Sequence, residues 1–206
     1  MRLMNSRVEE HLQIFSPIMK SKTSLVGLVL LLFFVFMAIF GPLIFSSELL
    51  LPHYSEIFAN PSIRHPLGTD VIGRDTLTLL VYGSRSVMIT AIVGASIIIL
   101  IGMTVGTISG YFMGTTDSAL MSITDIFLTI PAVPLFVVLA TILRSSLDPF
   151  GLALVFSSVA WPGLARAVRS QTLTLKEREF IEASRALGLN SYYIIFREIL
   201  PNMVAY

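Results

Sequence analysis

The amino-acid sequence predicts an all-α membrane protein, a polytopic bundle of four full transmembrane helices and the start of a fifth. Hydrophobic residues make up 54% of the 206 residues and charged residues only 13%, whereas a soluble domain carries about 25% charged residues. The mean hydropathy is +0.82. The apolar residues are also gathered into runs long enough to cross a hydrocarbon core of about 30 Å.

Five apolar segments account for these helices in chain order. They are Leu25 to Ile44, Val87 to Tyr111, Leu120 to Leu143, Phe150 to Ala167 and the terminal run Pro201 to Tyr206. The first segment is long and no small-residue cleavage site follows it, so we expect a retained anchor rather than a signal peptide. The third segment contains Pro131 and Pro134, which predict a kink because each removes a backbone hydrogen-bond donor.

Small residues recur along the second segment, with glycine at positions 102, 106 and 110. Glycines at every fourth position let helix backbones approach closely in lipid, so this face is expected to pack against another helix. A substrate-lining role is the alternative. Trp161, beside Pro162 in the fourth segment, is likewise expected to serve helix packing or the membrane interface.

The positions of lysine and arginine predict how the chain is oriented in the membrane. With the N-terminus in the cytoplasm, 10 of the 14 Lys and Arg residues lie on the cytoplasmic side and 4 lie outside, as the positive-inside rule expects. We therefore predict a cytoplasmic segment (1–23), an anchor helix with an external loop (24–86), and a core (87–206) whose cytoplasmic loop covers about 168–200.

The cytoplasmic loop has internal order between its apolar neighbours. Residues 175–187 have helix-forming composition. Gly188 suits the left-handed conformation of a helix C-terminal cap, and Asn190 or Ser191 can cap a second helix. The loop is therefore predicted to form a helix, a sharp turn and another helix before the fifth membrane segment.

The spacing of this loop resembles the cytoplasmic signature of permease subunits of binding-protein-dependent ABC importers. That signature reads E-A-A, three residues, G, nine residues, I-x-L-P. The matching positions are Glu182, Ala183, Ser184 in place of the second alanine, Gly188, Leu200 and Pro201. Glu198 stands where the signature often has isoleucine. Pro201 also suits the first turn of a helix, where a missing N–H costs little. The resemblance implies that these residues couple the membrane helices to an ATPase.

The external loop carries a second family pattern. Residues 65–86 contain HPLGTD, GRD and YGSRS, which resemble the H-P-x-G-T-D, G-R-D, Y-G-x-R-x-S run of the dipeptide, oligopeptide and nickel subfamily of these permeases. The residues that we single out in this run are Gly68, Thr69, Asp70, Gly73, Arg74, Asp75 and Arg85.

Apart from the family resemblance, the same residues predict a capped turn at Gly68 to Asp70 and then a short amphipathic helix. Its apolar residues would be Val71, Ile72, Leu77, Leu80 and Val81. The side chains of Arg74, Asp75 and Arg85 are expected to pair at the membrane surface. This segment is either a helix that anchors the chain at the lipid surface or a direct contact for substrate.

The sequence contains no catalytic constellation. Cysteine is absent, none of the three histidines has HExxH spacing, and no glycine loop with lysine is present to hold ATP phosphates. We therefore expect a non-enzymatic subunit with no metal or cofactor, ATP being bound by partner subunits, and no nucleic-acid partner. Asp125, the one acid within an apolar run, is expected either to pair or cap a helix or to act in gating. Pro131 and Pro134 are expected to form a packing kink or to line the pathway.

The resemblance covers nearly the whole chain and implies a permease subunit of an ATP-driven importer for dipeptides or oligopeptides, with nickel as a further possibility. It implies partnership with a homologous permease, two ABC ATPases, an extracytoplasmic solute-binding protein and lipid, in the cytoplasmic membrane of a bacterium or archaeon. The family has a type I importer bundle of six helices in this subfamily, so the chain is expected to be truncated by about two helices and inactive alone. A secondary transporter, which would need midplane ion sites, and a non-transporting scaffold are the alternatives.

Overall fold

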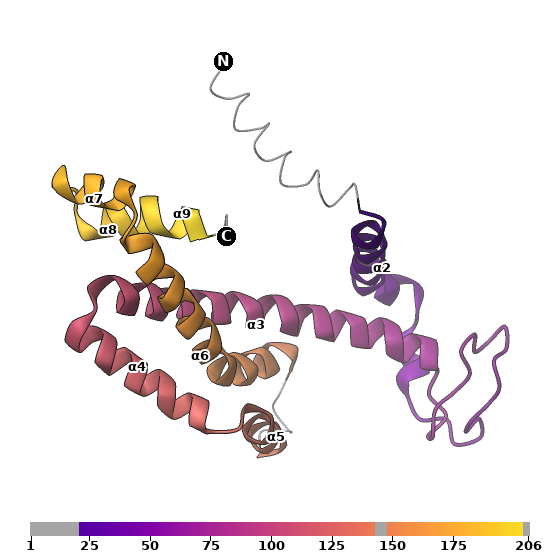
Figure 1. The fold of residues 1–206 in the computed structure, drawn as a ribbon. Coiled ribbons are helices and arrows are strands. Elements are labelled where there is room, and N and C mark those ends of the chain that lie inside the picture. The colour runs from indigo at the N-terminus through magenta and orange to yellow at the C-terminus, as the bar shows by residue number, and fades with distance from the viewer. Residues whose placement is uncertain (1–20, 143–147, 204–206) are drawn as a thin grey trace. The chain divides into compact units, whose positions relative to one another are not determined.

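The structure, a computed structural model, describes residues 21–142 and 148–203 (Figure 1). Helices dominate these residues, and the one β-bridge among them pairs Thr69 with Asp75. The chain divides into two compact units between Met88 and Ile89.

The first unit contains an apolar helix followed by a looped segment. Its elements are α2 (Lys22–Ile44), the short 3-10 helix η1 (Ser47–Leu50) and the first residues of α3 (Thr76–Phe112). The Ser21 hydroxyl oxygen caps α2 by accepting the Ser24 N–H at 3.5 Å. Gly41 leaves room for the buried Val81 side chain. The Tyr82 hydroxyl donates to the Phe45 carbonyl oxygen at 3.1 Å, so the loop closes back onto the start of α3.

The second membrane segment begins earlier than the sequence predicts. The predicted short helix, separate from a span starting at Val87, is correct only in its second half. Leu77, Leu80 and Val81 are helical, but they belong to α3, one helix of 37 residues that begins at Thr76 and continues past Val87. Val71 and Ile72 form a turn before it, and Asp75 belongs to the β-bridge. The helix starts at Thr76 because the preceding Asp75 side chain accepts the Thr78 N–H at 2.7 Å, as an N-cap does.

The second unit holds the remaining helices. Its elements are the rest of α3, α4 (Gly114–Thr129), α5 (Ala132–Ile142), α6 (Pro149–Lys176), α7 (Glu179–Ala186), α8 (Ser191–Tyr193), the π-helical turn η2 (Ile194–Ile199) and α9 (Leu200–Met203). The kink predicted from Pro131 and Pro134 is confirmed, and α4 and α5 meet at an angle of 76°. Pro131 lies in the break, and Pro134 lies in the first turn of α5, where a missing N–H breaks no helical bond. The segment begins at Gly114 rather than at Leu120.

Close packing of α3 against α6 confirms the prediction from the glycine spacing. A Cβ atom on Gly106 would overlap the Ala165 carbonyl oxygen and lie 2.7 Å from the Val168 Cβ. A Cβ on Gly102 would lie 2.9 Å from Leu164. On α6 itself Trp161 is buried, with its ring centroid 5.5 Å from that of Phe127 in an edge-to-face contact.

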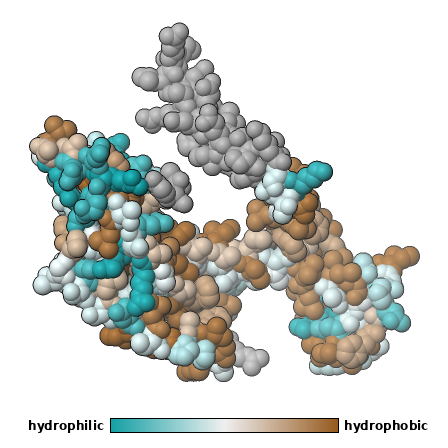
Figure 2. All heavy atoms as spheres, viewed as in Figure 1, coloured by the Kyte–Doolittle hydropathy of each residue, from teal (hydrophilic) through white to brown (hydrophobic). Residues whose placement is uncertain are grey.

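The fold is that of an all-α, multi-pass membrane protein. Among the described residues α2, α3 and α6 are each long and apolar enough to cross a membrane, and the bent pair α4 and α5 makes a fourth candidate span. Figure 2 shows hydrophobic residues over α2, while hydrophilic residues gather at the end of the second unit that holds α7 and α8.

Candidate functional site

The chain reverses sharply where α6 ends. One continuous helix over residues 175–187 is wrong, because α6 stops at Lys176 and α7 begins at Glu179. Arg178 adopts an extended backbone, with φ −79° and ψ 144°, and its carbonyl oxygen accepts the Ile181 N–H at 2.9 Å. The break therefore turns α7 away from the axis of α6.

Gly188 ends α7 in the left-handed conformation that the sequence predicts, with φ +75°. The Gly188 N–H donates to the Arg185 carbonyl oxygen at 2.9 Å, and the Leu189 N–H reaches back to the Ser184 carbonyl oxygen at 3.1 Å. These two bonds form a Schellman motif, which satisfies the last carbonyls of a helix. Among the residues that the structure describes, no atom lies within 4 Å of the position of a Cβ on Gly188, so the positive φ is what favours glycine at this position.

The second helix of the loop continues through Pro201 without a break. Asn190 is the cap, since its side-chain oxygen accepts the Tyr193 N–H at 2.7 Å. The helix then widens into the π-helical turn η2, where the Leu200 N–H donates to the Ile195 carbonyl oxygen. Pro201 therefore follows one residue inside α9 and does not open a separate helix. π-Turns are rare and occur often at functional sites.

One side of α7 packs against the other helices of the second unit. Ile181 is fully buried and Ser184 nearly so. The core they enter contains Tyr111, Val168, Leu175, Ile181, Ile194, Ile195, Ile199 and Met203. The Arg185 guanidinium also lies 5.4 Å from the centre of the Tyr111 ring, a cation–π contact between α7 and the end of α3.

The other side of the loop is exposed. Glu182 and Ala183 lie on this side of α7, and Leu187 is 80% exposed just before the turn. Tyr192 and Phe196 continue the exposed side on the second helix. We call these five residues the loop face. Large apolar side chains on so small a polar segment are typical of a protein-binding surface.

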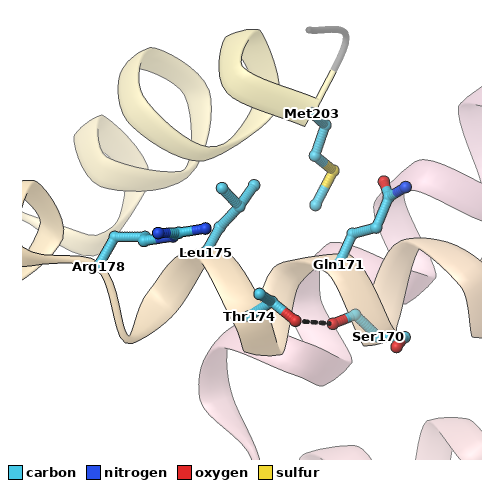
Figure 3. A pocket seen from close by; sticks show the side chains of 6 residues that line it. All are labelled: Ser170, Gln171, Thr174, Leu175, Arg178 and Met203. Carbon is cyan, nitrogen blue, oxygen red and sulfur yellow. Dashed lines mark hydrogen bonds between the residues drawn. The ribbon is translucent and has the colours of Figure 1, made fainter. Parts of the chain in front are cut away.

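A hollow of about 250 Å³ lies between the end of α6 and α9 (Figure 3). Its lining residues are Ser170, Gln171, Thr174, Leu175, Arg178 and Met203. The Leu175 and Met203 side chains point into it from the two helices. The Thr174 hydroxyl donates to the Ser170 carbonyl oxygen at 3.2 Å. Because Leu175 and Met203 also belong to the core described above, the hollow lies at the edge of that core.

Two ion pairs join α4 to α6. The Arg169 guanidinium donates twice to Asp117, at 2.6 and 2.5 Å, and the Ser109 hydroxyl also donates to that carboxylate. The Arg166 guanidinium donates to Asp125 at 2.6 Å. The structure therefore supports pairing for Asp125. The sequence analysis did not predict that Arg166 is the partner of Asp125, and it did not predict the pair of Asp117 with Arg169. The acids in α4 and the arginines in α6 were the pattern that could have indicated both pairs.

In the loop between α2 and α3 the residues of the second family pattern form a tight polar cluster. His65 Nδ1 lies 3.1 Å from Asp75 Oδ1, and both side chains are buried. The Asp70 carboxylate accepts from the Arg74 guanidinium at 2.8 and 2.7 Å. Pairing of Asp75 with Arg74 or Arg85 is therefore wrong: Asp75 pairs with His65, and Arg85 is exposed.

Glycine and threonine shape the backbone of the same cluster. Gly68 and Gly73 both have positive φ, 72° and 79°. The backbone of His53 approaches Gly73 so closely that a Cβ there would overlap it. Thr69 accepts the Ala59 N–H at 2.8 Å and donates to the Glu56 carbonyl oxygen. These contacts give Gly68, Thr69, Asp70, Gly73, Arg74 and Asp75 each a role in the structure of the loop.

Hydrogen bonding stabilises the charged forms of both acids. Burial raises the pKa of the Asp75 carboxyl, but hydrogen bonds from Thr78 and His65 outweigh it and hold that pKa below its ordinary value. For Asp70, burial likewise raises the pKa. The backbone N–H groups of Arg74 and Ile72 and the side chain of Arg74 donate hydrogen bonds to its carboxylate, and their combined effect holds the pKa below its ordinary value.

We predict that the loop between α2 and α3 loses stability in acid through Asp75. Because its folded pKa is depressed, the stabilisation is present above the ordinary pKa of about 4 and is lost as pH falls through the folded value. Hydrogen exchange of residues 60–80, corrected for the intrinsic pH effect, should therefore quicken below about pH 4. Asp75→Asn should be less protected at pH 7 and should lose most of this pH dependence, whereas Glu48→Gln, at an exposed carboxylate, should behave like the parent chain. An unchanged acid response in Asp75→Asn would contradict the assignment.

Comparison with known proteins identifies the family. The model of the binding-protein-dependent transport system inner membrane component matches residues 102–206, about half of the chain, and the chain belongs to this family. The model of the N-terminal TM domain of oligopeptide transport permease C matches residues 13–61. The resemblance inferred from the signature residues is confirmed.

Two relatives show where the chain falls within the family. The dipeptide transport system permease protein DppC of Alkalihalophilus pseudofirmus is 36% identical over 194 residues, which cover 93% of this chain and 62% of the relative. The oligopeptide transport system permease protein OppC of Bacillus subtilis is 32% identical over 182 residues, which cover 88% of this chain and 59% of the relative. The chain spans about three fifths of the length of these curated relatives.

Proposed function

We propose that this chain is the membrane permease subunit of an ATP-driven importer of dipeptides or oligopeptides. The relatives are peptide permeases by name, which favours peptides over nickel, and family membership favours this mechanism over a secondary transporter. The subunit itself performs no hydrolysis: ATP binds to two partner ATPases, and a solute-binding protein delivers the peptide to a pathway shared with a homologous permease.

The observation that supports this proposal is that the segment after α6 is buried on one side and exposed on the other. We call this segment the α7 loop; it comprises α7, the turn at Gly188 and the helix that begins at Ser191. Ile181 fixes α7 to the ends of α3 and α6, while the loop face on the opposite side is free to meet a partner. A rigid helix held between a partner and the membrane helices can transmit a displacement from one to the other. The sharp turn at Gly188 sets the angle between the two helices of the loop. We propose that ATPase closure moves this loop as one body and thereby alternates access.

The proposal requires the α7 loop to lie in the cytoplasm. It also requires the loop between α2 and α3, which holds His65 and Asp75, to lie outside the cell. The chain has no native cysteine, so single cysteines report side without background. In intact cells a membrane-impermeant maleimide should label Asn60→Cys and should fail to label Leu187→Cys. Opening the cells should make Leu187→Cys reactive, since that side chain is 80% exposed. Labelling of Leu187→Cys in intact cells would refute the orientation and with it the coupling role.

A further inference from the structure

The connection between α3 and α4 carries two exposed apolar side chains. Phe112, the last residue of α3, is 51% exposed, and Met113, which joins the two helices, is 44% exposed. We call these two residues the turn patch. Figure 1 shows the connection at the same end of the second unit as α7 and α8. Exposed apolar side chains mark contacts with protein or with membrane, so the depth of the turn patch decides between the two.

The turn patch lies beyond the apolar part of α6. That part ends near Ala167, and Lys176 follows by nine residues, or about 14 Å along the helix. The Lys176 Nζ atom lies 2.8 Å from the Met113 Sδ atom. A Cβ on Gly110, just before the patch, would lie 2.7 Å from the Thr172 Cβ. The end of α3 is therefore level with the polar end of α6, outside the hydrocarbon layer, and lipid tails do not cover the patch.

The backbone of Met113 has a conformation that residues with side chains rarely adopt. Its φ is 57° and its ψ is −163°, close to a region occupied almost only by glycine. The turn is nevertheless fixed by two backbone hydrogen bonds. The Met113 N–H donates to the Ser109 carbonyl oxygen at 3.1 Å, and the Met113 carbonyl oxygen accepts the Asp117 N–H at 3.3 Å. An exposed methionine in a strained position, where glycine would relieve the strain, indicates that its side chain has a use.

Side-chain contacts join the turn patch to α7. The Phe112 ring meets the Tyr111 ring edge to face, with centroids 5.2 Å apart. The Arg185 guanidinium lies over the same Tyr111 ring, 5.4 Å from its centre. Arg185 is exposed and follows Glu182, a member of the loop face, by three residues, so the two are neighbours on the surface of α7. The turn patch and the loop face therefore belong to one continuous exposed surface.

We propose that the turn patch is a second contact for the ATPase subunit that binds the loop face. This inference rests on the proposed function, which supplies the partner. An ATPase bound to the loop face would extend over Phe112 and Met113, and burial of these side chains would remove apolar surface from water. The ATPase would then hold the end of α3 as well as α7. Its displacement would reach α3 directly, in addition to the route through Ile181.

Photo-cross-linking with one aromatic probe at three positions tests the contact. The amino acid p-benzoylphenylalanine would replace Phe112 in the turn patch, Tyr192 in the loop face, or Phe156 in the apolar part of α6. Phe156 is the matched control, because it is 47% exposed and precedes Lys176 by about 30 Å along α6. In a full-length form of this permease, co-expressed with the importer ATPases, we expect ATPase adducts from the probes at Phe112 and Tyr192 and none from the probe at Phe156.

The other outcomes separate this inference from the proposed function. An ATPase adduct at Tyr192 without one at Phe112, or equal yields at Phe112 and Phe156, would overturn the second contact and leave the coupling role of the loop face standing. Lipid adducts at Phe112 in place of ATPase adducts would likewise overturn it. An adduct at Phe112 alone would contradict the loop face as a docking site while supporting the turn patch. The absence of adducts at both positions, in complexes that contain the ATPases, would overturn both proposals.

Met113→Gly separates a docking role from a structural one. Glycine adopts the positive φ without strain, so the transition temperature of the purified permease should not fall. The ATPase concentration that half-saturates the permease in membranes should nevertheless rise about tenfold, as expected when one apolar side chain is lost from an interface. Unchanged ATPase binding by Met113→Gly would show that this side chain contacts no ATPase, and would overturn its part in the contact.

Discussion

Replacing Gly106 with leucine should separate α3 from α6 and strongly destabilise the second unit. A side chain at this position has no room, because the Ala165 carbonyl oxygen and the Val168 Cβ occupy its space. Overpacking of this kind costs about 1–3 kcal/mol or more. Since this contact belongs to a row that also includes Gly102 and Gly110, the helices cannot shift locally to relieve it.

Heating the purified chain in detergent provides the measurement. Trp161 is the only tryptophan and is buried against Phe127, so its fluorescence reports on the second unit. Gly106→Leu should lower the transition temperature by about 5 to 10 °C, at about 2–4 °C per kcal/mol. Gly163→Leu, on α6, should leave the temperature nearly unchanged, because no atom in the described part of the chain lies within 4 Å of its Cβ position. A shift of the same size in both variants would mean that the close approach does not support the fold.

Replacing Gly188 with valine in a full-length form of this permease should abolish most ATP-driven uptake while leaving insertion intact. The φ of +75° costs a β-branched residue more than about 1–2 kcal/mol, and within residues 21–142 and 148–203 no atom lies within 4 Å of the Cβ position. The strain is therefore expected to alter the turn and the direction of the second helix, rather than the packing of Ile181. The membrane helices should be unaffected, because a side chain at this position would contact none of their described residues.

Uptake by the assembled complex and immunoblotting of the membrane fraction measure the two effects separately. Gly188→Val should reduce uptake about tenfold or more, as expected from a loss above about 1.4 kcal/mol in a coupled equilibrium, with an unchanged amount of protein. Gly188→Asn is the control, since asparagine tolerates the left-handed region, and it should retain most of the activity. Full uptake by the valine variant would show that the turn does not transmit motion.

Local features of the fold were predictable because local chemistry determines them. The left-handed Gly188, the Asn190 cap and the proline kink each depend on a few neighbouring residues, and each is present. The glycine spacing likewise predicted a close helix contact, though not its partner α6. Composition alone located the candidate membrane spans, although the predicted ends differ from those in the structure: α3 begins at Thr76 and α4 at Gly114.

The errors arise where contacts between distant residues decide the structure. The break at Arg178 follows from the burial of Ile181 against α6, which outweighs the helix propensity of the intervening residues. The Asp75 pairing depends on a loop that brings His65 beside it, and the α4 pairs join residues 52 and 41 positions apart.

The central claim, that the α7 loop receives the ATPases, is tested most directly by photo-cross-linking. A benzophenone maleimide attached at Ala183→Cys, on the loop face, would be activated in membranes that contain the co-expressed importer ATPases. Arg64→Cys, with a parent side chain that is 78% exposed in the external loop, provides the matched control. We expect an adduct with an ATPase subunit from Ala183→Cys and none from Arg64→Cys. Absence of an ATPase adduct at Ala183→Cys in complexes that contain the ATPases, or an equal yield from Arg64→Cys, would contradict the coupling role.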